Sequence, residues 1–552
     1  MVRVLQGAAA SVLAAVVFVV TAGASGDTPL TKAVKSGDLP AVRTLIKSGA
    51  DVNARSGDGS TPLLWAAHNS NDEIARALIA AKASADVAND YGVTPLLEAS
   101  KTGDAAMMEL LLQAGANPSL AHPEGQTPLL AAARSGSVPA VRLLLSRGVD
   151  VNAAEKYQQT SALMWAVADN HLDVVELLIE AGADINRQAH VTSITDRKNA
   201  DHPTGGFTAL MWAARSGNET MVRRLVAKGA NVNLRNGDGA SATMIAIYND
   251  HFDVAAGLIE LGSDANDGSL YMAVEMRDAT TDQFAFDGSR RRPDHPNTKT
   301  ALDLMKALLE KGADPNKTFT GQLHSTSMPN TDRFDNTPFF RAAIAADVEA
   351  LKVLIAHGAK LDQTPFVEPA PEKDKDKPDQ PATPGRRGNA NAGRTAAMVS
   401  MTGGRGPGMT GGPGYIRDGA APYREPGSRK PEDAFVLLLS SGASPNATGP
   451  DGNSLLHQAA RAGSLEMIRA LAAARVDFTL KNNDGFTALD VAEGKQPPRA
   501  PGAGPGAAPP PGGAGRRGGR GANQQDVAKL LRELMGLPPA PPAAATTAEA
   551  RQ

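Results

Sequence analysis

Few side chains in this 552-residue sequence have the types and spacing that catalysis or metal binding requires. His190 and His202 lie close enough in the sequence to ligate one metal ion, but no third ligand follows at a diagnostic spacing. The sequence also lacks a Gly-rich phosphate loop, a metalloprotease histidine pair and a Gly-x-Ser-x-Gly elbow in a strand-to-helix context. We therefore predict a protein that is not an enzyme and has no catalytic, metal-binding or cofactor-binding residues.

Charge and cysteine content exclude further kinds of functional site and binding partner. The chain has no cysteine, so disulfides, thiolate metal sites and cysteine nucleophiles are all excluded. Its net charge of -3 gives no general attraction to nucleic acid or anionic lipid. An Arg-Gly run at 515–521 is similar to RNA-binding segments, but one short copy is better explained as a soluble linker. We expect a protein partner and no nucleic acid.

Tryptophan is enriched among the anchor residues of protein interfaces. Six residues are candidates for contact with a protein partner: Trp65, Tyr91, Tyr157, Trp165, Trp212 and Arg341. Their value as binding residues depends on the elements that carry them, and a repeated pattern in the sequence defines those elements.

A Thr-Pro-Leu type segment returns along the chain, most often after 33 residues, with its clearest copies at Thr28, Thr61, Thr94 and Thr127. A second landmark of the Gly-Ala-Asp-Val-Asn type follows it at Gly49, Gly115, Gly148, Gly182, Gly229, Gly262, Gly312, Gly358 and Gly442, with Lys82 and Arg475 in place of two more glycines. An internal repeat of this length indicates one stacked array in which each unit contacts its neighbours.

Each repeat predicts two short helices. Thr61 can cap a helix that begins at Pro62, where the missing proline N–H is harmless. After a polar turn, Ile74 and Leu78 recur at the spacing of a second helix. A glycine such as Gly49 then ends that helix, and the chain returns to the next repeat through a turn or hairpin.

This helix–turn–helix unit, with its two landmarks, resembles the ankyrin repeat family over most of residues 27–536. The resemblance implies an all-α solenoid of about twelve repeats that binds proteins through its concave surface and hairpin loops. The chain departs from the family pattern at the histidine that usually follows Thr-Pro-Leu, which is present only at His457.

The three tryptophans share one repeat position, about 200° around the first helix from the leucine of the landmark. Its other occupants include Lys32, Glu98, Ala131, Ile245, Arg341 and Gln458, so we expect the position not to be uniformly buried. The resemblance implies that this surface faces the concave groove. A tryptophan here either anchors a partner or covers the alanines of its neighbour. Tyr91 and Tyr157 lie at hairpin tips, where they either bind a partner or are incidentally exposed.

The repeat period breaks at several insertions. Repeats 1–9 occupy residues 25–362, with insertions near 188–206, 277–299 and 317–335. Residues 363–430 interrupt repeat 10 with Gly- and Pro-rich sequence that we expect to be largely disordered. Repeats 10–12 occupy 431–536, with a disordered insertion at 497–525 and a last helix at 526–535, before a disordered Pro/Ala-rich tail at 537–552.

Residues 1–24 have the features of an export signal: Arg3, an apolar run at 8–20 and the small residues Ala22-Gly23-Ala24. We expect a monomeric protein-binding scaffold that is periplasmic or secreted, with no membrane insertion after the signal is cleaved. Two alternatives stay open: a secreted effector that binds proteins of another cell, and a chain anchored by an uncleaved N-terminal segment.

Overall fold

The computed structural model describes residues 26–191, 205–237, 239–277, 297–319, 337–364, 393–401, 427–495 and 520–539. The proposed signal and His202 lie outside these ranges, as do residues 540–552 of the expected tail. Within the described ranges the chain is helical, and its β-structure consists of isolated bridge residues, among them the pairs Val191–Gly205, Arg235–Ser241 and Thr448–Ser454. None of the helices in these ranges is long and apolar enough to cross a membrane. The predicted all-α class is confirmed.

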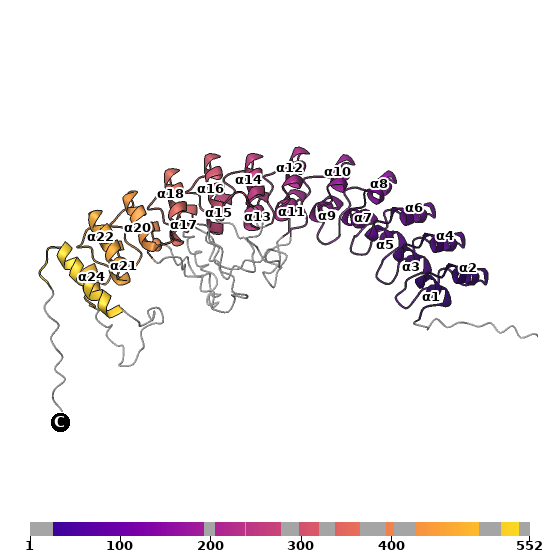
Figure 1. Cartoon of the computed structure of the whole chain (residues 1–552), viewed down its shortest axis with the longest axis horizontal. Helices are drawn as coiled ribbons and strands as arrows, with labels where there is room; N and C mark the ends of the chain where they lie inside the picture. Colours follow the sequence, from indigo (N-terminus) through magenta and orange to yellow (C-terminus); the bar gives the residue numbers. More distant parts are fainter. Residues whose placement is uncertain are drawn as a thin grey trace, which may run out of the picture. The chain divides into compact units, whose positions relative to one another are not determined.

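The chain divides into two compact units. The first unit, Met1–Tyr157 with Glu176–Ala181, contains four helix pairs (Figure 1). Its helices are α1 (Pro29–Lys35), α2 (Leu39–Lys47), α3 (Pro62–His68), α4 (Asp72–Ala80), α5 (Pro95–Thr102), α6 (Ala105–Gln113), α7 (Pro128–Ser135) and α8 (Val138–Ser146). Each odd-numbered first helix packs on the next first helix, and each second helix on the next second helix.

The second unit, Gln158–Val175 with Gly182–Gln552, continues the same pairing. Its helices are α9 (Ala162–Ala168), α11 (Ala209–Arg215), α12 (Glu219–Ala227), α13 (Ala242–Tyr248), α14 (Phe252–Glu260), α15 (Ser269–Arg277), α16 (Ala301–Glu310), α17 (Pro338–Ile344), α18 (Val348–Ala356), α19 (Ala396–Ser400), α20 (Pro431–Ser440), α21 (Leu455–Ala462), α22 (Leu465–Ala473), α23 (Ala488–Ala492) and α24 (Arg520–Leu534). Helix α10 (Leu172–Glu180) contributes residues to both units.

The helix ends form as the sequence predicts. The Thr61 hydroxyl accepts a hydrogen bond from Leu64 N at 3.2 Å, and Pro62 opens α3. Gly49, after α2, has a left-handed φ of 84°. Lys82 and Arg475, at the equivalent positions, also adopt left-handed φ values of 69° and 60°, which non-glycine residues rarely do. The turn after the second helix therefore imposes its conformation even without glycine.

The core is a thin layer between neighbouring helices. Ile74 and Leu78 of α4 are fully buried, and so are Ala66 and Ala67 of α3. Small alanines let the first helices approach closely, while the larger aliphatic side chains fill the space between the two helices of a pair. Each fully buried Leu or Ile contributes roughly 1.5–3 kcal/mol, so stability accumulates interface by interface.

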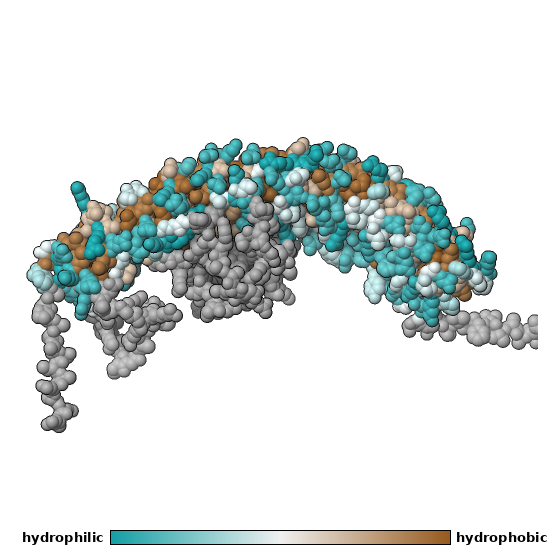
Figure 2. Space-filling model, in the orientation of Figure 1, coloured by the Kyte–Doolittle hydropathy of each residue, from teal (hydrophilic) through white to brown (hydrophobic). Residues whose placement is uncertain are grey.

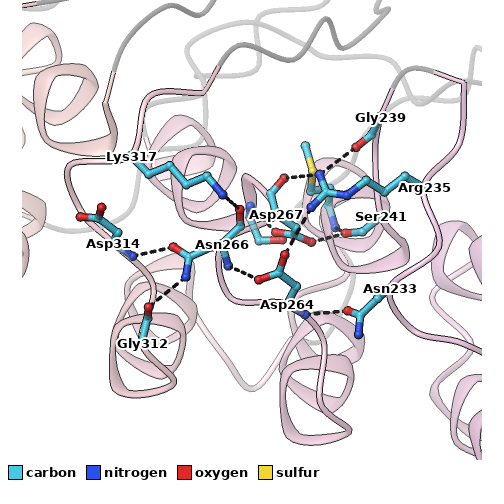
Figure 3. A network of polar contacts seen from close by, with 12 residues as sticks. Asn233, Arg235, Gly239, Ser241, Asp264, Asn266, Asp267, Gly312, Asp314 and Lys317 are labelled. Atoms are coloured by element: carbon cyan, nitrogen blue, oxygen red, sulfur yellow. Dashed lines mark hydrogen bonds and ion pairs between the residues drawn. The ribbon is translucent and has the colours of Figure 1, made fainter.

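A ladder of side-chain hydrogen bonds joins successive hairpins. Asn233 Oδ1 accepts from Asp264 N at 2.7 Å, and Asn266 Oδ1 accepts from Asp314 N at 2.8 Å (Figure 3). The Asn266 amide also donates to Gly312 O at 3.1 Å. These asparagines come from the second sequence landmark, so the same repeat position joins one turn to the next at both of these steps.

The ladder continues across the insertions. Its partners are 31 residues apart where the repeat is regular, as for Asn53 Oδ1 and Ser84 N. They are 45 apart for Asn186 Oδ1 and Asn231 N, and 82 apart for Asp362 and Ser444 N. Extra residues therefore enter the chain between the partners without changing the contact that aligns neighbouring repeats.

Residues at the edges of the predicted insertions belong to the packed array. In the first insertion, Ala189 N donates to Phe207 O at 2.9 Å, and Val191 bridges to Gly205. Phe319, in the third, is 9% exposed and stacks on Tyr271 with ring centroids 5.2 Å apart. The inserted sequence that remains between these edges lies outside the described residues.

The last helix differs from its predicted bounds. The Gly- and Arg-rich composition predicts a start at 526, but α24 begins at Arg520. Helix α24 packs against α21, α22 and α23, and Gln524 Nε2 donates to Ala460 O at 3.2 Å. Gln524, which the composition places in the disordered insertion, therefore belongs to a helix that packs on the array.

Candidate protein-binding surface

The hairpin tips of the first unit form a closely stacked row. Asp90 N donates to Asp58 O at 3.1 Å, and two repeats further on Lys156 N donates to Glu124 O at 2.9 Å. Gly125 has a φ of +91°, and a Cβ built on it would lie 2.6 Å from Lys156 N. A side chain therefore cannot be accommodated there without moving the next hairpin, which makes the row of tips a defined surface.

Tyr91 and Tyr157 project from this row. They are 69% and 66% exposed, the highest values for large hydrophobic side chains in the described part of the chain. Arg55 forms an ion pair with Asp90 at 2.8 Å, next to Tyr91, and Lys156 Nζ lies 5.6 Å from the centroid of the Tyr157 ring. Each tyrosine is thus an accessible aromatic ring beside charged groups, a combination that protein interfaces use.

Trp65 is half-buried and has neighbours on its ring. Lys35 Nζ from α1 lies 4.0 Å from the ring centroid, and the His68 ring lies 5.5 Å away in an edge-on arrangement. The indole Nε1 is buried and makes no hydrogen bond. The side chain therefore packs into the first-helix surface and presents only part of its ring.

Trp165 and Trp212 are also half-buried, on α9 and α11, which pack against each other. The Trp212 ring lies 5.2 Å from the ring of Phe207, and Arg215 covers it at 5.1 Å. Both interpretations of the tryptophan position thus keep support: these rings stabilise neighbouring helices and retain partial exposure.

Arg341 corrects the expectation of an accessible residue. Its side chain is only 5% exposed, and its guanidinium forms an ion pair with Glu275, with Nη2 and Glu275 Oε1 3.2 Å apart. Ile245, at the same repeat position, is 7% exposed. The position is exposed at Lys32 but buried at these two residues, so its accessibility changes along the array. Arg341 is part of the interior.

A row of cationic side chains was not predicted from the sequence. Lys35, His68, Lys101 and Arg134 follow one another at steps of 33 residues, in the last turns of α1, α3, α5 and α7. We call these four residues the cation row. The equal spacing is the sequence signal that could have revealed it, because a step of one repeat returns to the same helix face.

Contacts through Glu98 link two members of the cation row, on α3 and α5. His68 Nδ1 lies 2.8 Å from Glu98 Oε1, and Lys101 Nζ lies 3.1 Å from Glu98 Oε2. Partial burial opposes ionisation of Glu98, but the hydrogen bonds from His68 and Lys101 prevail and lower its pKa. Glu98 is therefore an anion held between two members of the row. Figure 2 shows mainly hydrophilic residues over the visible face of the α1–α8 segment.

His251 and His190 are two further histidines that the structure describes. His251 Nε2 contacts Arg215 O at 3.0 Å in the turn before α14, consistent with a structural role. His190 is exposed, while its proposed metal-binding companion His202 lies outside the described residues. In the described part of the chain, no three His, Cys, Asp or Glu side chains gather as metal ligands would.

Comparisons with known proteins identify the repeat. A family model described as ankyrin repeats (3 copies) matches residues 30–122, 96–189 and 191–268, and one described as ankyrin repeats (many copies) matches 438–492. A search of curated proteins returns no match.

Two solved ankyrin repeat domains are similar to the chain. That of human ASB11 is 26% identical, with 43% of this chain and 99% of that chain covered and a TM-score of 0.37. That of Bcl-3, a member of the IkappaB protein family, is 29% identical, with 42% and 99% covered and a TM-score of 0.35.

Proposed function

Because the chain belongs to the ankyrin repeat family, we propose that it is a non-catalytic scaffold that binds a protein partner through the hairpin tips and first helices of the first unit. The observation that carries this proposal is the exposure of Tyr91 and Tyr157, 69% and 66%, on one row of stacked tips. Backbone hydrogen bonds between neighbouring tips hold the chain beside both rings, so a partner would meet an ordered surface.

Order before binding is the physical advantage of this arrangement. A protein interface loses affinity for every loop and side chain that must be immobilised. The hydrogen bonds between Asp58 and Asp90, and between Glu124 and Lys156, already hold the tips. Binding of a partner would therefore cost little free energy for ordering the tips.

Cross-linking in the native compartment, followed by identification of the captured proteins, tests the proposal. The wild-type chain should capture a defined partner, and the double variant Tyr91→Ala/Tyr157→Ala should capture at least about tenfold less. Val436→Ala removes a side chain that is 38% exposed on α20 and serves as the control. Equal capture by the double variant and the control would reject the tyrosines as anchors.

We also propose that the protein is exported. The support is the sequence of residues 1–24, with its early Arg3, apolar run and small residues before Ser25. N-terminal sequencing of the protein from fractionated cells should find a mature chain that begins near Ser25, outside the cytoplasm. A cytoplasmic chain that still begins at Met1 would reject export.

A further inference from the structure

We propose that the cation row binds an extended acidic segment of the partner protein, with one acidic residue at about every third position. This inference rests on the protein-binding function proposed above and adds the chemistry of the partner. It follows from three features of the row: the positive charge of its side chains, their exposure, and their spacing of one residue per repeat.

All four members of the row are cations or can become cations, and none is buried. Their side chains are 32% exposed for Lys35, 52% for His68 and 39% for Lys101. Arg134 is exposed at the end of α7. Lys32, one turn before Lys35, adds a further exposed cation to the same face.

Helix stabilisation alone does not explain the row. A cation in the last turn interacts favourably with the negative end of any helix dipole. The second helices α4, α6 and α8 end in the same unit with no basic residue in their last turns. Of the four second helices only α2 has such a residue, Lys47, whereas all four first helices have one. Because the dipole is common to all these helices, the presence of a cation on every first helix indicates a second role for this face.

The step of the row sets the register of a ligand. Neighbouring helices pack about 8–10 Å apart, so one cation is expected roughly every 10 Å along the first helices. An extended chain advances about 3.3 Å per residue, and a polyproline II segment about 3.1 Å with three residues per turn. Acidic side chains at about every third residue would therefore face successive cations.

Anionic groups beside the row favour a spaced acidic peptide over a nucleic acid. Asp27 pairs with Lys35 at 2.8 Å, and Glu98 lies between His68 and Lys101. Asp38 and Asp104 cap the second helices that follow α1 and α5. A continuous polyanion would meet these carboxylates, whereas a peptide with neutral residues between its acids can place them there.

A labelled synthetic peptide with the repeating sequence Glu-Pro-Ala tests this inference on the full chain by fluorescence anisotropy. Its control has the same composition with the glutamates clustered. The triple variant Lys35→Gln/Lys101→Gln/Arg134→Gln neutralises the row. Its matched control, Arg43→Gln/Arg76→Gln/Arg142→Gln, removes the same number of charges from exposed positions on α2, α4 and α8.

We expect the regular peptide to bind more tightly than the clustered one, and the row variant to lose about tenfold in affinity while its matched control loses less than about twofold. Added salt should weaken binding. The charge-retaining variant Lys35→Arg/Lys101→Arg/Arg134→Lys should keep the affinity, which separates loss of charge from loss of folding.

Three outcomes would overturn the inference: no binding of the regular peptide, equal losses in the row variant and its matched control, or tighter binding of single-stranded DNA. If the peptide does not bind but capture of a protein partner still depends on the tyrosines, the acidic-segment inference is rejected and the scaffold function is retained. If neither the peptide binds nor the tyrosines matter for capture, both proposals are rejected.

Discussion

The guanidinium of Arg277 donates to the carboxylate of Asp347, with Nε and Oδ2 2.7 Å apart, although the residues are 70 positions apart and each side chain is only 1% exposed. Arg429 donates to the same carboxylate from Nη1 at 2.9 Å. Asp347 also caps α18 by accepting from Ala350 N at 3.1 Å. One buried carboxylate thus joins α15, the start of α18 and the segment before α20.

Asp347→Ala should be among the most destabilising substitutions in the second unit. It leaves two largely buried guanidinium groups without their carboxylate, which typically costs about 3–5 kcal/mol. Hydrogen exchange should show faster opening of α15 and α18 than in the wild type. Glu349→Ala, at an exposed residue two positions later, is the control and should change little. Similar protection in both variants would contradict the assigned role.

Gly125→Ala should loosen the hairpin that carries Tyr157. The substitution combines a left-handed φ of +91° with a Cβ 2.6 Å from Lys156 N, and such strain costs about 1–3 kcal/mol. Gly49→Ala is the matched control, since its φ is +84° and no atom lies within 4 Å of its Cβ. Gly125→Ala should lower the midpoint temperature of thermal unfolding more than Gly49→Ala does. The Lys156 amide should also exchange faster in Gly125→Ala. Equal effects would show that the collision relaxes without cost.

Asn266→Ala should weaken one step of the ladder and leave the others intact. It removes the acceptor for Asp314 N and the donor to Gly312 O, a loss of about 1 kcal/mol for exposed neutral hydrogen bonds. Amide exchange should rise at Asp314 and stay unchanged at Asp264. Asn266→Asp retains the acceptor and should preserve protection at Asp314. A global loss of protection would mean that the ladder does not act step by step.

His457 should make the last repeats sensitive to mild acid. Its Nδ1 accepts from Ser454 N at 3.2 Å, and its Nε2 donates to Phe486 O at 2.8 Å, so the neutral ring joins two repeats. Burial and the nearby Arg461 lower its pKa below 6.5, against the opposing effect of the bond to Phe486.

A histidine with a depressed folded-state pKa contributes stability above its unfolded value, about 6.5, and loses it as the pH falls below that value. The stability of α21 and α23 should therefore decline as the pH drops below 6.5. His457→Leu should flatten this decline, while His357→Gln, at an exposed residue, should retain it. A decline that survives His457→Leu would assign the effect to other groups.

The sequence predicted the local structure well because local rules determine it. Thr61 and Pro62 specify a helix start through groups within one turn of each other, and Gly49 marks a left-handed turn. Their repetition then defines the stacking. The same rules predicted that Tyr91 and Tyr157 would lie on hairpin tips, where the structure exposes them, while their role in binding stays a prediction.

The distant contacts could not be predicted in this way. Arg341 and Glu275 are 66 residues apart, and Arg429 and Asp347 are 82 apart, with inserted sequence between each pair. A separation of 66 would place Glu275 and Arg341 two repeats apart, whereas α15 and α17 are neighbours, so the repeat period does not predict the pair. Arg429 lies in a segment whose composition predicts disorder. A charged side chain can be buried when a side chain of opposite charge pairs with it. Such partners are distant in the sequence here, so only the packed structure shows which charged residues are buried.

The ladder has a consequence for how such a gene can change during evolution. The ladder partners lie at equivalent places in the repeats that they join, so duplication or deletion of one whole repeat joins two compatible ends. Insertions between the partners are tolerated in the same way, as the 82-residue interval between Asp362 and Ser444 demonstrates. Unequal recombination can thus lengthen or shorten the array in whole units, and each hairpin that it adds brings a new tip on which selection can act.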